Sequence, residues 1–170
     1  QNTRAMGTRG DQPRTDDTGV LEQLTRVYSV IGQPDSGGIS VDVGAYIGVI
    51  SLAMARFGPA NHAVHSFEAD DLNYARLRQN VSSVPGGSIH THNTAVGKQV
   101  GRAEFTRNQD PGTNSLSDVA SSSNSPTDVY TVPVTTLDAF AEEQGIKEID
   151  VLKIDVEGAE LSALASGKRA

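Results

Sequence analysis

The feature that most constrains this chain is a regular alternation of short apolar strands with helical segments, which begins at Ile39. β-Branched residues predict a strand at 39–43, and a glycine-containing turn leads into a helix at 47–57. The same pattern continues through a strand at 63–67, a helix at 70–81 and a strand at 88–93. This order predicts an α/β fold of the Rossmann-like kind, with a mostly parallel sheet, helices on both faces and right-handed crossovers.

The pattern changes after the third strand. Segments 94–97, 101–105 and 129–134 resemble strands with no helix between them, which predicts an antiparallel insertion. Residues 107–128 form a long, polar, serine-rich connection, and by composition Asn114-Ser115-Leu116 is a turn within it.

The alternation then resumes toward the end of the chain. A helix is expected at 136–144, an apolar strand buried on both faces at 148–155, and a last helix from about Gly158. In the helix at 70–81, Leu72, Ala75 and Leu77 or Val81 are expected to face inward. Residues 1–17 lack apolar periodicity and are expected to be a disordered lead, followed by a helix from Thr18, so that one domain spans 18–170.

Composition excludes several functional classes. The 170 residues carry a formal net charge of −7, which disfavours a nucleic-acid partner because binding phosphates requires a basic face. No apolar run is long enough to span a membrane, and a cytoplasmic location is expected. The absence of cysteine excludes thiolate metal sites, and His90 and His92, on one face of a strand, lack a suitably spaced third ligand, so no metal is expected.

The turn after the first strand is the first candidate binding site. Val41-Asp42-Val43-Gly44-Ala45-Tyr46-Ile47-Gly48 would place a helix N-terminus at the carboxyl edge of the sheet, where open α/β folds bind ligands. The alternative is a tight turn whose glycines serve the backbone alone. A dinucleotide fingerprint needs glycine where Tyr46 stands, so a ligand without phosphate, such as S-adenosylmethionine, fits better than NAD(P).

Two charged segments complete the candidate site. Glu68 ends the second strand 24 residues after Gly44, a distance typical of acidic residues that accept ribose hydroxyls; the alternative is a solvated carboxylate near a helix start. Alternate strand residues share a face, so Lys153, Asp155 and Glu157 would converge at the end of the last strand. Alternatively, an ion pair there merely closes the strand.

These segments together resemble the FkbM methyltransferase family. The matching stretches are VDVGAYIG (41–48), FEAD (67–70), NTAVG (93–97), NSL (114–116), VPVTTLD (132–138) and IDVLKIDVEGAEL (149–161), in the family's order and spacing. The last stretch is the most specific. The resemblance implies a class I methyltransferase fold, S-adenosylmethionine as the methyl donor and O-methylation of a sugar, polyketide or other small molecule.

The resemblance also implies roles for individual residues. Asp42, Gly44 and Gly48 would border the methionine part of the cofactor, and Glu68 would hold its ribose. Ala45 and Tyr46, in the same turn, would also bind the cofactor. Along the adenine would lie Asn93, Ala95 and Val96, and the cleft between cofactor and acceptor would be lined by Lys153, Asp155, Glu157 and Glu160. Asp155 is the first candidate for the base that takes the hydroxyl proton, Glu157 the second, and Lys153 would orient the carboxylate.

The sequence departs from the family in three ways. The family's G-A-N-I-G turn has Tyr46 in place of asparagine, and its F-E-P reads F-E-A here. Family members continue with further strands, so the chain is expected to be C-terminally truncated, with the strand at 148–155 as an incomplete sheet edge open to self-association. Two rival functions are a non-catalytic cofactor-binding scaffold and an NAD(P)-dependent oxidoreductase.

Overall fold

The computed structural model describes residues 37–59, 61–82, 84, 88–108, 115–116, 126–156 and 158–168, together with Gly19, Glu22 and Arg26. These three single residues are helical, but the rest of the expected lead and first helix lies outside the described residues. Among the described residues, no helix combines the length and apolarity needed to cross a membrane.

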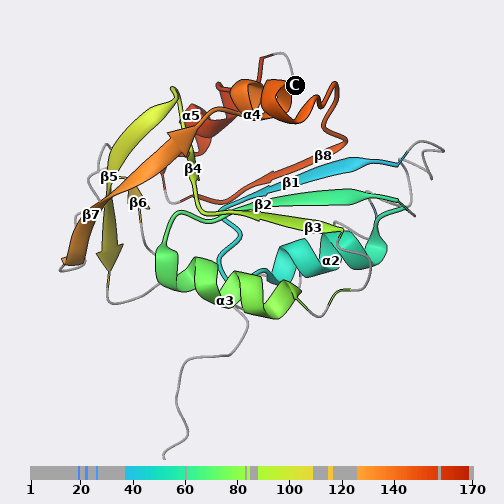
Figure 1. Cartoon of the computed structure of the whole chain (residues 1–170), viewed down its shortest axis with the longest axis horizontal. Coiled ribbons are helices and arrows are strands. Elements are labelled where there is room, and N and C mark those ends of the chain that lie inside the picture. Colours follow the sequence, from blue (N-terminus) through green and yellow to red (C-terminus); the bar gives the residue numbers. More distant parts are fainter. Residues whose placement is uncertain are drawn as a thin grey trace, which may run out of the picture.

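A four-stranded parallel sheet, sheet A, forms the centre of the molecule (Figure 1). Its strands lie in the order β3-β2-β1-β8, and every neighbouring pair is parallel, as the alternating sequence pattern predicts. The strands are β1 (Ile39–Val43), β2 (Ala63–Phe67), β3 (Ile89–His92) and β8 (Val151–Ile154).

Helices cover both faces of sheet A, as expected (Figure 1). On one face lie α2 (Val49–Phe57) and α3 (Asp71–Val81), and on the other lie α4 (Leu137–Gln144) and α5 (Glu160–Leu164). Because side chains alternate along a strand, Val64 packs with Met54 of α2 while Phe67 packs with Phe140 of α4.

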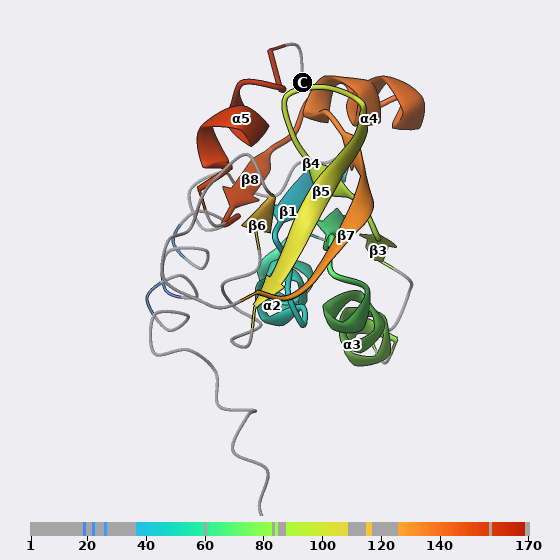
Figure 2. The same cartoon turned by 90° about the vertical axis from the view of Figure 1, so that its left-hand side faces the viewer.

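The antiparallel insertion is also confirmed. It forms sheet B, in the order β4-β7-β5-β6, where β5 pairs antiparallel with both β6 and β7. Figure 2 shows β5 and β7 in front of sheet A, beyond the carboxyl ends of its strands. The strands are β4 (Ala95–Val96), β5 (Gly101–Asn108), β6 (Ser115–Leu116) and β7 (Pro126–Thr135).

Several local predictions need correction. Ser115 and Leu116 pair with β5 as a short strand rather than forming a turn. Local composition did not predict this strand, because its partners on β5 are brought next to it only by folding. In α3, Leu77 and Val81 are buried as predicted, but Leu72 is 56% exposed, Ala75 is exposed and Asn73 is buried. The inward face of α3 is therefore only partly the one that apolar residues alone predict.

The last strand is shorter and less buried than predicted. β8 spans only Val151–Ile154, and Leu152 is 36% exposed. Among the described residues β8 pairs with β1 alone and lies at one end of sheet A, so the strand is at an edge as expected. Self-association through this edge stays a prediction.

Candidate active site

The glycine turn after β1 brings three distant segments to one edge of sheet A. The backbone N–H groups of Gly44 and Ala45 both donate to the carbonyl oxygen of Phe67, at 3.0 and 2.9 Å. Gly44 has a φ of 75°, and a Cβ atom added to it would lie 2.0 Å from the carbonyl oxygen of Asp155. Only glycine fits this turn, because the chain after β8 passes directly against it.

Tyr46 occupies a strained position in the same turn. Its φ of 52° lies in the left-handed region, which residues other than glycine and asparagine seldom adopt. Its N–H donates to Oε2 of Glu68 at 2.8 Å, and the N–H of Gly48 donates to Ala45. The amides of residues 44–46 and 48 are therefore bonded within the protein, so they do not form a phosphate cradle.

Glu68 is the ionisable group at the centre of this edge. Its side chain is buried, and its two oxygens accept separate backbone N–H groups, from Tyr46 at 2.8 Å and from Asp70 at 2.9 Å. Burial raises the pKa of Glu68 to about 7; the charge of Asp70 adds to this rise, while the two N–H bonds and the charge of Lys153 oppose it. Each carboxylate oxygen can still accept one further hydrogen bond, which suits a pair of neighbouring hydroxyl groups.

Lys153, which is partly buried, and Asp42, which is fully buried, form an ion pair behind the turn. Nζ of Lys153 lies 3.0 Å from Oδ1 of Asp42 and donates to the carbonyl oxygen of Gly44 at 2.8 Å. The other oxygen of Asp42 accepts the hydroxyl of Ser51 at 2.6 Å, and Ser66 donates in turn to Ser51. This chain of polar groups joins β8, β1, α2 and β2 beneath the glycine turn.

The residues predicted to line the cleft between cofactor and acceptor differ in their exposure and in their contacts. The Asp155 side chain is 68% exposed, next to the glycine turn, with Oδ2 3.9 Å from Nζ of Lys153. Lys153 thus contacts Asp42 and Gly44 more closely than Asp155. Glu160 is exposed and accepts the N–H of Gly158, and Glu157 lies outside the described residues. The catalytic roles of Asp155, Glu157 and Lys153 and the expected place of Glu160 along the cleft stay predictions.

The segment after β3 contacts the loop that carries Glu68. The Asn93 side-chain amide donates to the carbonyl oxygens of Glu68 and Ala69, at 3.0 and 3.2 Å, so it fixes the loop that carries Glu68. Ala95 and Val96 are buried and pack in apolar clusters with residues of sheet B and α4. The expected contact of this segment with an adenine ring stays a prediction.

Sequence reasoning missed one part of this edge, the contacts of the Asp70 side chain. Asp70 is only 1% exposed and accepts hydrogen bonds from Arg107 of β5 and Tyr130 of β7, at 2.6 and 2.9 Å. The sequence separations are 37 and 60 residues, so no spacing rule identifies these partners.

Parallel strands with helices on both faces, a glycine turn and a buried carboxylate at the end of β2 define a Rossmann-like α/β fold with a candidate nucleoside site. Residues 42–170 match the sequence model of the Methyltransferase FkbM domain, which covers most of the chain. The chain belongs to the FkbM methyltransferase family.

A solved structure of an FkbM methyltransferase supports this fold. An FkbM methyltransferase from Methylobacillus flagellatus KT aligns with a TM-score of 0.50 and 21% identity, over 84% of this chain and 32% of that one. An rRNA methylase from Streptococcus thermophilus aligns at 13% identity and a TM-score of 0.37, over 51% of each chain. The chain therefore spans about a third to a half of the length of these structures. None of the curated proteins matches the chain.

Proposed function

We propose that the protein binds S-adenosylmethionine and transfers its methyl group to a hydroxyl of a small molecule such as a sugar or polyketide. The observation that carries this proposal is the Glu68 carboxylate, buried at the carboxyl edge of sheet A and held by the amides of Tyr46 and Asp70. An orientated carboxylate with two acceptor oxygens suits the paired hydroxyls of a ribose.

The glycine turn favours a nucleoside without a pyrophosphate. The amides of residues 44–46 donate within the protein, and the side chain of Tyr46 stands where a dinucleotide site needs glycine. This arrangement favours S-adenosylmethionine over NAD(P). S-adenosylmethionine would supply an electrophilic methyl group on its sulfonium.

Asp155 is the proposed general base. It is exposed beside Gly44, where its carboxylate can take the proton of an acceptor hydroxyl as that oxygen attacks the methyl carbon and the methyl–sulfur bond breaks. A positioned base contributes about 10²–10⁴-fold, and alignment of the two reacting atoms contributes more. Glu157 is the second candidate for this role.

Calorimetric titration with S-adenosylhomocysteine tests the cofactor assignment. Wild-type protein should release or absorb heat with this ligand at pH 8 and show no heat with NAD or NADH. Glu68→Gln should weaken binding about 10- to 100-fold, because the site loses a charged acceptor of hydroxyl groups. The matched control is Glu104→Gln, on the exposed side of β5, which should bind as wild type does.

Two results would contradict the proposal. Binding of NADH without S-adenosylhomocysteine would favour an oxidoreductase, and no heat with either ligand would favour a non-binding scaffold. Catalysis requires a second assay, in which tritium-labelled S-adenosylmethionine is offered with a panel of sugars and polyketide alcohols. Asp155→Asn should bind S-adenosylhomocysteine normally and lose transfer; full turnover by this variant would reject Asp155 as the base.

A further inference from the structure

The Asp70 carboxylate joins the candidate cofactor edge to sheet B. Its Oδ1 caps α3 by accepting the N–H groups of Leu72 and Asn73, both at 2.9 Å. Its Oδ2 accepts Nε of Arg107 at 2.6 Å and the hydroxyl of Tyr130 at 2.9 Å. The backbone N–H of the same residue donates to Oε1 of Glu68. Asp70 therefore links sheet B, by hydrogen bonds, to the carboxylate that is proposed to bind the ribose.

The two partners of Asp70 are held in place by one another. Arg107 donates to the Tyr130 hydroxyl at 3.0 Å, and its guanidinium lies over the Tyr130 ring, 4.8 Å from the ring centre. Arg107 also contacts Asp71 and lies 3.7 Å from Asp128. The Arg107 side chain is 20% exposed, so solvent screens this group of charges only in part. β5 and β7 thus supply hydrogen bonds to the residue that caps the N-terminus of α3.

We propose that Arg107 and Tyr130 are positioning residues for the nucleoside site, acting on Glu68 through Asp70. They fix the Asp70 side chain, and the Asp70 amide in turn orients the Glu68 carboxylate. Arg107 also neutralises the Asp70 charge next to Glu68. This inference rests on the proposed function, and it gives the antiparallel insertion a part in cofactor binding.

The electrostatic part follows from the charges that face Glu68. Burial alone would raise the pKa of Asp70, but the bonds from Arg107, Asn73 and Tyr130 lower it, so Asp70 is a carboxylate. Among the described residues, the charges acting on Glu68 are that carboxylate, which raises its pKa, and Lys153, which lowers it. Without Arg107, the full negative charge of Asp70 would act on Glu68, so ionising Glu68 would become harder.

Titration of the ligand-free protein tests this coupling without any assumption about the cofactor. The carboxyl ¹³C signal of Glu68 should titrate near pH 7 in wild type. In Arg107→Gln the midpoint should rise by roughly one pH unit, because a like charge is no longer compensated. In the double variant Arg107→Gln/Asp70→Asn it should return to or below the wild-type value, since asparagine still caps the helix but carries no charge.

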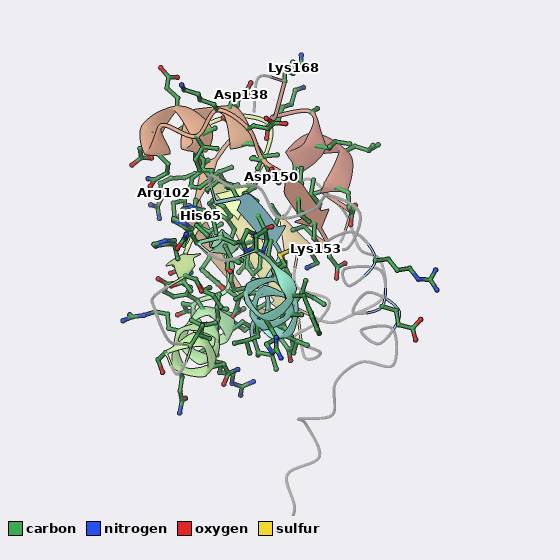
Figure 3. All side chains as sticks on the ribbon, turned by 90° about the vertical axis from the view of Figure 1, so that its right-hand side faces the viewer. His65, Arg102, Asp138, Asp150, Lys153 and Lys168 are labelled. Atoms are coloured by element: carbon green, nitrogen blue, oxygen red, sulfur yellow. The ribbon has the colours of Figure 1, made fainter. Side chains whose placement is uncertain are left out.

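Binding of S-adenosylhomocysteine tests the positioning role. Arg107→Gln should weaken binding about tenfold at pH 8. This effect is similar in size to the loss of affinity when a residue that orients a ligand-binding side chain is removed. Tyr130→Phe keeps the ring under the guanidinium, so it should weaken binding about threefold and leave the Glu68 midpoint unchanged. The matched control is Arg102→Gln: Arg102 lies on the same strand, is exposed and donates to Thr131 of β7. Figure 3 shows Arg102 well apart from Lys153.

The outcomes separate the inference from the proposed function. If Arg107→Gln binds like Arg102→Gln and its Glu68 midpoint does not move, the inference is wrong even though the cofactor assignment stands. If Arg107→Gln loses binding while its Glu68 midpoint does not move, the role of Arg107 is purely structural, and the inference is rejected as well. If wild type does not bind S-adenosylhomocysteine, the proposed function fails, and the positioning role fails with it whatever the titration gives.

Discussion

At the scale of single residues, Tyr46 combines a bulky side chain with a left-handed backbone conformation. Its φ of 52° is one that asparagine tolerates and bulky residues resist. The N–H of Tyr46 nevertheless binds Glu68, so the turn keeps its shape against an unfavourable backbone preference.

Two substitutions that both remove the Tyr46 ring isolate this strain. Tyr46→Asn should be more stable than Tyr46→Ala by about 0.5–1 kcal/mol, because asparagine adopts the left-handed region more readily than alanine. Urea denaturation of the two variants measures the difference in the free energy of unfolding. Equal stabilities would show that the backbone at residue 46 is not strained.

Gly44 should be far more sensitive to substitution than Gly145. Both have left-handed φ values, 75° and 67°, but a Cβ at Gly44 would meet the backbone of Asp155, whereas nothing lies within 4 Å of one at Gly145. Gly145→Ala should lose only about 1 kcal/mol of stability. Gly44→Ala should lose more than about 3 kcal/mol or fail to fold. Similar losses in a thermal or urea melt would mean that the close approach to Asp155 does not exist.

At the scale of elements, the sequence indicated most of the strands and helices but not all of their faces. The alternation of short apolar strands with helical segments, together with the glycine turns, was enough to predict the strands of sheet A and their parallel direction, because local rules determine both. The buried face of α3 was predicted only in part: Leu77 and Val81 are buried as expected, but Asn73 is buried and Leu72 is exposed, a result of tertiary packing that an apolar pattern does not contain. Arg107 and Tyr130 lie 37 and 60 residues after Asp70, and no sequence pattern predicts that these side chains meet. The site was therefore only partly predictable.

The ion pair between β8 and β1 should be important for stability. Lys153→Met would leave Asp42, which is fully buried, without its cation, and the free energy of unfolding should fall by about 3–5 kcal/mol. Adding Asp42→Asn should recover much of this loss, because the uncompensated charge disappears. Lys98→Met, at an exposed lysine, serves as the control and should change stability by less than about 0.5 kcal/mol. A loss no larger than that of the control would contradict the buried pairing.

At the scale of the whole molecule, two of the groups that affect the response to pH, His65 and Glu68, are buried and have pKa shifts in opposite directions. Burial, followed by the charges of His92 and His90, lowers the pKa of His65 to about 4 from 6.5. Between these values the unfolded chain binds more protons than the folded one, so stability falls as the pH drops from 6.5 to 4. The raised pKa of Glu68 acts in the opposite sense between about pH 4.5 and 7.

A comparison of wild type with His65→Phe separates these two contributions, because Glu68 is common to both proteins. Between pH 7 and pH 4, wild type should lose about 3 kcal/mol more stability than the variant. Urea unfolding at several pH values gives this difference directly. Parallel pH profiles for the two proteins would mean that His65 titrates normally and is not buried as described.

The central claim is that the glycine turn, the end of β2 and the end of β8 together bind one nucleoside. A crystal structure with S-adenosylhomocysteine tests it most directly. The account predicts that both ribose hydroxyls lie within about 3.2 Å of the Glu68 carboxylate oxygens, beside the turn at Gly44 and the backbone of Asp155. A ligand bound elsewhere, with Glu68 still contacting only the amides of Tyr46 and Asp70, would contradict it.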